Sequence, residues 1–236
     1  MKLPDKTVTD GVIHGRWYED ACAAAFAMEL LGERWSLLIV RELMLGPRRF
    51  SEMRGELPGL SAKVLTERLV RLENIGVLVR RRLPPPISAQ VFELTDWGRE
   101  LEEVIQALGR WAVRSPLHDA TLPMTPTSFL LSLRTMLIAD RGDDFEARVL
   151  FRTPDNLLFA SLAGGELNVA REPHPVPQAD LEYTADSVVQ FLGVFYGKRS
   201  ADECGVTVTG DPALAALFAD LFSLPPKCPV LPAWAV

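Results

Sequence analysis

Apolar residues recur at helical spacing from residue 20 to residue 44, and the pattern is broken once. Gly32 interrupts it and Gly46-Pro47 ends it, because glycine and proline disfavour the interior of a helix. After an expected N-terminal arm of residues 1–19, the spacing therefore predicts two helices that are separated near Gly32. Their apolar positions are Phe26, Leu30, Trp35, Leu38, Ile39 and Leu43.

Two more helices with short turns follow. The first is a short helix over residues 50–57, which Pro58-Gly59 ends. The second is a helix over residues 61–76, for which Ser61 is a favourable N-cap and Gly76 a C-terminal stop. The predicted buried stripe of this last helix consists of Leu65, Leu69 and Leu72.

A hairpin and a long helix complete this part of the chain. Residues 77–82 and 91–95 are rich in β-branched and aromatic residues, and the prolines of residues 83–90 prevent regular pairing at the tip. Thr95 can cap a helix over residues 96–115. Helices, turn, helix and wing in this order predict a winged helix-turn-helix.

The second half of the chain has an α+β pattern. The stretch over residues 115–128 contains three prolines and few large residues, so a linker is placed at residues 117–127, with the boundary near Leu122. A region over residues 128–236 is expected to bind an effector or to support assembly. Its predicted helices cover residues 128–140, 184–197 and 213–222, the last beginning at Asp211-Pro212, and its predicted strands cover residues 145–151, 156–162, 166–170, 179–184 and 206–210.

Composition narrows the class of protein. With 48% hydrophobic and 24% charged residues, the chain is typical of a globular protein. No apolar run approaches the length that crosses a bilayer, so we expect a cytoplasmic protein without a membrane partner. No cofactor, metal site or disulfide is expected, because the cysteines and histidines stand singly; these are Cys22, Cys204, Cys228, His14, His118 and His174.

Charge is distributed unevenly along the chain. The whole sequence carries a net charge of −6, yet residues 33–82 hold 11 Arg and Lys against 6 Glu. A basic segment within an acidic chain can neutralise phosphates, while the acidic remainder discourages indiscriminate binding. This asymmetry favours a nucleic-acid partner.

Roughly residues 20–115 resemble the HxlR family of winged-helix regulators. The resemblance is carried by the run ELLGERWSLLIVRELMLGPRRFSEMRGELPGLSAKVLTERLVRLENIGVLVRR. It implies a DNA-binding and dimerisation domain over residues 20–116. The chain departs from the family pattern in three places: Ala23 stands where a proline is common, Gly32-Glu33-Arg34-Trp35 stands where Gly-Gly-Lys-Trp is often found, and the wing tip, Pro84 to Gln90, has no basic residue. The run GVTVTGDPALAALFADLF is similar to sterol-carrier proteins, which implies a carrier-like fold for the second half.

Side chains on the helix over residues 61–76 are the first candidate DNA contacts. With the leucine stripe inward, the side chains facing the groove are Lys63, Thr66, Glu67 and Val70, with Arg71 at the edge. Ser61 and the helix start can hold a phosphate. The remaining candidate phosphate contacts are Arg48, Arg49, Arg80, Arg81 and Arg82. The alternative interpretation is a solvated helix face.

Two further sites are considered. The family resemblance implies that Cys22 can act as a redox sensor, but its small apolar neighbours favour an inert, packed thiol. The segment from Val188 to Tyr196 is apolar nearly all round. Its side chains either line a pocket for a small apolar effector or fill the core, and the candidate pocket residues are Phe191, Leu192 and Phe195.

The leading hypothesis is a homodimeric regulator, more often a repressor, that binds a pseudo-palindromic operator in double-stranded DNA. The alternative is a carrier of apolar molecules whose helical half serves dimerisation. An enzyme is not expected, because the sequence has no nucleophile elbow, phosphate loop or paired Cys/His cluster.

Overall fold

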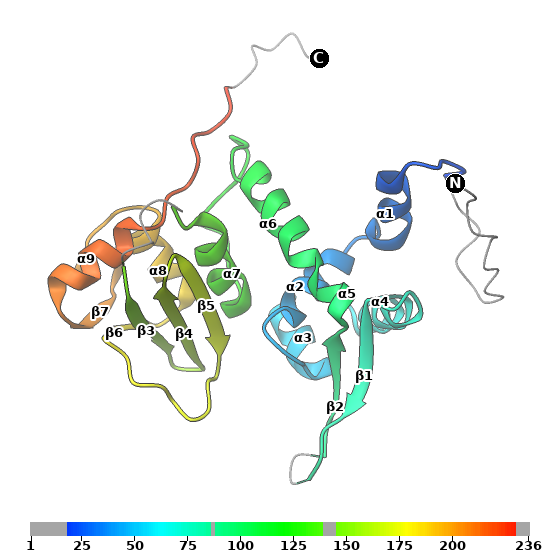
Figure 1. Cartoon of the computed structure of the whole chain (residues 1–236), viewed down its shortest axis with the longest axis horizontal. Helices are drawn as coiled ribbons and strands as arrows, with labels where there is room; N and C mark the ends of the chain where they lie inside the picture. Colours follow the sequence, from blue (N-terminus) through cyan, green and yellow to red (C-terminus); the bar gives the residue numbers. More distant parts are fainter. Residues whose placement is uncertain (1–17, 86–87, 139–144, 230–236) are drawn as a thin grey trace.

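The computed structural model describes residues 18–85, 88–138 and 145–229. Most of the predicted N-terminal arm, two residues of the wing tip and the last seven residues lie outside this range. Figure 1 shows two parts side by side, which we call the winged-helix half (residues 18–116) and the C-terminal half (residues 117–229). Each has its own hydrophobic core.

The winged-helix half has the predicted order of elements. A two-stranded antiparallel sheet pairs Leu78 with Leu94 at its base and Arg82 with Gln90 towards the tip. The elements are α1 (Ala23–Leu31), α2 (Ser36–Leu43), α3 (Phe50–Glu56), α4 (Ala62–Asn74), β1 (Leu78–Arg82), β2 (Gln90–Leu94), α5 (Asp96–Arg99) and α6 (Leu101–Ala112).

The single helix predicted over residues 96–115 is wrong, because the structure divides it at Glu100 into α5 and α6. Thr95 caps α5, as predicted, by accepting a hydrogen bond from the Gly98 N–H at 3.0 Å. Gly98 is buried, and a Cβ atom there would lie 2.1 Å from the Val77 carbonyl oxygen. The position of α5 is therefore set by its close approach to Val77, at the start of the wing.

A five-stranded sheet, in the order β5-β4-β3-β6-β7, forms the C-terminal half. The pair β3 and β6 is parallel, and the other pairs are antiparallel. The turn between β4 and β5 contains Gly164 and Gly165, both at positive φ. The elements are α7 (Pro126–Met136), β3 (Ala147–Thr153), β4 (Asn156–Ala163), β5 (Glu166–Arg171), β6 (Leu181–Thr184), α8 (Val188–Phe195), a 3-10 turn (Asp202–Cys204), β7 (Thr207–Gly210) and α9 (Pro212–Asp220).

The predicted linker over residues 117–127 is too long. Thr125 already caps α7 by accepting a hydrogen bond from the Ser128 N–H at 3.0 Å, and Pro126 is the first residue of the helix. Proline suits this position because its missing N–H would have no helical partner. The connection between the two halves is therefore shorter than the prolines suggested.

Polar contacts join the two halves. The Thr125 hydroxyl donates to the buried Glu42 carboxylate at 2.9 Å, and Arg134 of α7 pairs with Glu102 of α6. Near the end of the described chain, the Lys227 ammonium donates to the Val113 carbonyl at 2.8 Å. No helix among the described residues is long and apolar enough to cross a membrane.

Candidate nucleic-acid interface

Helix α4 has one buried and one exposed face, as its sequence predicted. Its start is fixed by Ser61, whose hydroxyl oxygen accepts a hydrogen bond from the Val64 N–H at 3.2 Å. Leu65, Leu69 and Leu72 are buried in the core of the winged-helix half. The four side chains predicted to face the groove are exposed: Lys63, Thr66, Glu67 and Val70.

The exposed side chains of α4 are only weakly held. The Lys63 ammonium lies 4.0 Å from the Glu67 carboxylate, and the lysine side chain is 86% exposed. An exposed pair of this kind contributes about 0.3 to 0.5 kcal/mol, so Lys63 can leave it for DNA at little cost. The Thr66 hydroxyl donates to the Ala62 carbonyl at 2.9 Å, which leaves its oxygen free to accept.

Arg71 differs from the prediction that it borders the groove. Its side chain is 12% exposed, and its guanidinium donates to the Glu33 carboxylate at 3.0 Å and to the Glu29 carbonyl. Arg68 pairs with the same carboxylate at 2.5 Å. Both arginines therefore hold α4 against the segment between α1 and α2, and Arg71 is removed from the candidate DNA contacts.

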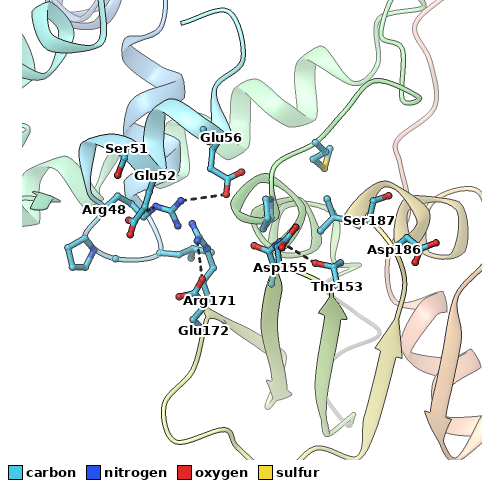
Figure 2. Close-up of a pocket in the computed structure, with 18 residues that line it drawn as sticks. Arg48, Ser51, Glu52, Glu56, Thr153, Asp155, Arg171, Glu172, Asp186 and Ser187 are labelled. Carbon is cyan, nitrogen blue, oxygen red and sulfur yellow. Dashed lines mark hydrogen bonds and ion pairs between the residues drawn. The ribbon is translucent and has the colours of Figure 1, made fainter. Parts of the chain in front are cut away.

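Arg48 also turns away from the predicted DNA surface. Its side chain is 10% exposed and forms ion pairs of 3.5 Å with Glu52 and with Glu56, which Figure 2 shows beside a cavity between the two halves. Its backbone N–H and carbonyl both bond to Phe92 of β2, at 2.9 and 2.8 Å. Arg48 thus joins α3 to the wing, and burial combined with repulsion from Glu42 raises the pKa of the Glu56 carboxyl.

Arg49 is well placed for a phosphate contact. Its side chain is 46% exposed, and its closest carboxylate oxygen, on Glu52, lies 3.9 Å away. The Glu52 carboxylate also accepts the Arg49 backbone N–H at 2.9 Å, which fixes the start of α3. Arg49 therefore remains a candidate where α3 would cross the DNA backbone.

The three arginines of β1 differ in how firmly they are held. Arg80 pairs with Glu73 at 3.0 Å and lies 5.3 Å from the Phe92 ring centroid, and Arg81 pairs with Glu93 at 2.8 Å. Arg82 is exposed, and among the described residues no ion pair or hydrogen bond holds its side chain. Arg82 is accordingly the arginine of this strand most available to a phosphate.

Arg54 was missed by the sequence reasoning. It is exposed in the last turn of α3, directly after the buried Met53. Because Met53 faces the core, helical spacing turns Arg54 outward, and this spacing was the signal that could have identified it. We add Arg54 to the candidate phosphate contacts.

Cys22 lies at the N-cap of α1 and is exposed, so the packed position that its apolar neighbours suggested is wrong. The backbone N–H groups of Ala25 and Ala24 lower the pKa of its thiol, because they stabilise the thiolate at the helix start. A lowered pKa and exposure are the two properties that make a cysteine reactive.

A set of large apolar side chains is exposed on α1, α5 and α6. Helix α6 has no buried residue, and Figure 1 shows α1 standing away from the body of the winged-helix half. Exposed apolar residues of this size mark surfaces for protein partners where they lie together, as Val104, Leu108 and Trp111 do on one face of α6. The set, which we call the apolar face, comprises Phe26, Met28, Trp97, Val104, Leu108 and Trp111.

The three candidate effector residues fill the core of the C-terminal half. Phe191 and Phe195 have no exposed surface, and Leu192 is 8% exposed. The Phe191 ring lies 5.4 Å from the rings of Phe129 and Phe151. None of the three candidates lines the cavity shown in Figure 2.

Three elements in sequence define a winged helix-turn-helix DNA-binding protein: a short helix, an exposed helix with an ordered start, and a two-stranded wing. The model of the HxlR-like helix-turn-helix family matches residues 30–118. The uncharacterized HTH-type transcriptional regulator YvaP of Bacillus subtilis is 41% identical over 86 residues, which are 36% of this chain and 80% of that relative.

Two further comparisons concern one regulator. The HTH-type transcriptional regulator YodB of Bacillus subtilis is 41% identical over 86 residues, 36% of this chain and 77% of its own. A solved structure of the reduced form of YodB is 37% identical and covers 42% of this chain and 98% of that one, with a TM-score of 0.38. The chain belongs to the HxlR-like helix-turn-helix family, and its relatives YvaP and YodB are named as HTH-type transcriptional regulators.

Proposed function

We propose that the protein is a homodimeric transcriptional regulator that reads an imperfect palindrome through α4. The observation that carries this proposal is the exposed face of α4, where Lys63, Thr66, Glu67 and Val70 project from a helix with a capped start. Such side chains can bond base edges in the major groove or contact a thymine methyl group. Arg49, Arg54 and Arg82 supply phosphate contacts on either side of this helix.

The apolar face supports the homodimer. Trp111 is 75% exposed and Met28 is 51% exposed, and burial of such side chains against a second copy would remove them from water. One reading helix in each subunit then faces successive major grooves, so half-sites should be centred about 10 base pairs, or a multiple, apart.

The carrier alternative has less support. A carrier of apolar molecules needs an apolar cavity, whereas Phe191 and Phe195 fill the core and the cavity in Figure 2 is lined by charged side chains. The sterol-carrier-like character of the C-terminal half stays a prediction. We propose that this half binds an effector or supports assembly.

Selection of binding sites from random duplexes, followed by footprinting, tests the proposal. We expect a protected imperfect palindrome bound by a dimer, with affinity that falls as salt rises. The matched control for variants on α4 is Arg152→Ala, which also removes one positive charge but lies on β3, where Arg152 pairs with Glu182. Selection of no sequence, or protection of one half-site by a monomer, would contradict the proposal.

A further inference from the structure

A cavity of about 790 Å³ lies between α3 of the winged-helix half and the sheet of the C-terminal half (Figure 2). Two arginines and five carboxylates line it, which leaves a surplus of three negative charges. Its volume falls within the range of about 300 to 1,000 Å³ that is typical of small-molecule sites. The lining is polar, so any ligand must supply hydrogen-bonding groups.

The two arginines come from different halves and both are nearly buried. Arg48 precedes α3, and Arg171 ends β5; their side chains are 10% and 9% exposed. The Arg171 Nε atom is buried without a hydrogen-bond partner, although Arg171 donates through Nη1 to Thr127 at 3.0 Å; the Arg48 Nε atom also makes no hydrogen bond, but it lies 3.5 Å from the Glu52 carboxylate. A buried N–H without an acceptor is costly, and an acidic oxygen of a ligand would satisfy it.

Two of the carboxylates are exposed and have no cationic partner among the described residues. Asp155 lies in the turn between β3 and β4, and Asp186 lies just before α8. Figure 2 shows Asp155 between Arg171 and Asp186, and Asp186 on the side of the cavity away from the two arginines. The cavity thus has paired carboxylates beside the arginines and free carboxylates extending from them to the opposite side.

We propose that this cavity binds a small zwitterionic, peptide-like molecule. Its acidic group lies at Arg48 and Arg171, and its amino group lies at Asp155 and Asp186. A purely anionic ligand would meet the surplus of negative charge, and a purely cationic ligand would leave the buried Arg171 Nε atom without an acceptor. A zwitterion satisfies both regions.

The position of the cavity connects this ligand to regulation, and this step rests on the proposed function. Arg48 is bonded through its backbone to the wing at Phe92, and it pairs with Glu52 and Glu56 of α3. A ligand that also engages Arg171 fixes α3 and the wing relative to the C-terminal half. It can therefore favour one arrangement of the DNA-binding surface over another.

Titration calorimetry on the full chain tests the site. The probes are oligoglycines of increasing length with free termini, together with their N-acetylated and C-amidated forms. We expect saturable binding of at least one free peptide, and weakening by about tenfold when either terminus is capped. Absence of saturable heat from every free peptide, or equal binding of capped and free forms, overturns the proposal.

Variants assign the two ends of the ligand. Asp155→Asn and Asp186→Asn change exposed residues and should weaken the free peptide but not its N-acetylated form. The matched control is Asp202→Asn, an exposed acid outside the cavity, which should bind the peptide as the unaltered chain does. Equal weakening by Asp202→Asn and by the two cavity variants overturns the assignment.

Gel shifts on the same preparations separate this inference from the proposed function. A change in operator affinity on adding the peptide supports the regulatory step, and an unchanged affinity with confirmed peptide binding overturns that step alone. If the chain binds no DNA sequence, the proposed function fails, and calorimetry still decides the site.

Discussion

Replacing Lys63 with alanine should change which DNA sequences bind, whereas replacing Arg71 with alanine should weaken the fold. Both residues are basic and lie on α4, and the sequence placed both at the DNA surface. The structure separates them, because the Lys63 side chain is 86% exposed and the Arg71 side chain is 12% exposed. The pair of variants therefore tests the orientation of α4.

The expected magnitudes follow from the contacts of each residue. The Lys63→Ala variant loses only the exposed ion pair with Glu67, which is worth about 0.3 to 0.5 kcal/mol. The free energy of unfolding should therefore change little. A lost base contact should weaken operator binding by about 1 to 3 kcal/mol for each half-site. Removal of Arg71 breaks hydrogen bonds to Glu33 and Glu29, worth about 1.5 to 3 kcal/mol, near the lower end because Arg68 still neutralises Glu33.

Fluorescence anisotropy on operator and random duplexes, with urea unfolding of the same preparations, measures both quantities. The expected result is a loss of specificity without loss of stability for Lys63→Ala, and the reverse for Arg71→Ala. If Lys63→Ala weakens both duplexes equally, the lysine contacts phosphate rather than bases. If Arg71→Ala lowers operator affinity without lowering stability, our orientation of α4 is wrong.

Other predictions concern the wing, the apolar face, the thiol and the core. Arg82→Ala should weaken operator and random duplex alike and reduce the slope of log affinity against log salt by about 0.9 for each phosphate lost; an unchanged slope would refute the contact. Trp111→Glu should dissociate the dimer without unfolding the subunit, and a dimer retained in sedimentation would exclude this face. Because the pKa of the Cys22 thiol is lowered, its thiolate forms at lower pH. The alkylation that is lost in the Cys22→Ser variant should therefore reach half its maximal rate at a lower pH than the alkylation of free cysteine does. Phe191→Ala should cost about 3 to 5 kcal/mol in denaturant unfolding; a loss below about 1 kcal/mol would mean that the ring is not tightly packed.

Hydrophobic spacing was sufficient to predict most elements, because each helix or strand buries one face. It failed where a contact distant in sequence decides the geometry. The division between α5 and α6 depends on the approach of Gly98 to Val77, which helical spacing within residues 96–115 cannot reveal. Thr125-Pro126 is a local signal for the start of α7, as an N-cap followed by a proline at the first helical position, but the neighbouring prolines favour a linker.

The exposed residues of α4 were predictable because the buried face of the helix fixes the opposite face, whereas the ion pairs of the arginines were not predictable. Arg71 bonds to Glu33, 38 residues earlier in the sequence, and Arg81 pairs with Glu93 across the wing. Counting charge over residues 33–82 therefore overstates the positive charge available to DNA. The arginines that remain available are those whose neighbours offer no close carboxylate.

The contacts of Glu42 bear on whether the winged-helix half is complete by residue 116, as its sequence suggested. Glu42 is 1% exposed, and the same carboxylate oxygen accepts from Arg41 at 2.7 Å and from Thr125 of the C-terminal half at 2.9 Å. Removal of Thr125 would leave this buried oxygen with one neighbouring cation, at a cost of about 1 to 3 kcal/mol. Because α2 also packs against α7, the C-terminal half contributes directly to the stability of the helices that precede α4. A change in the C-terminal half that displaces Thr125 would therefore remove a hydrogen bond from a buried carboxylate of α2.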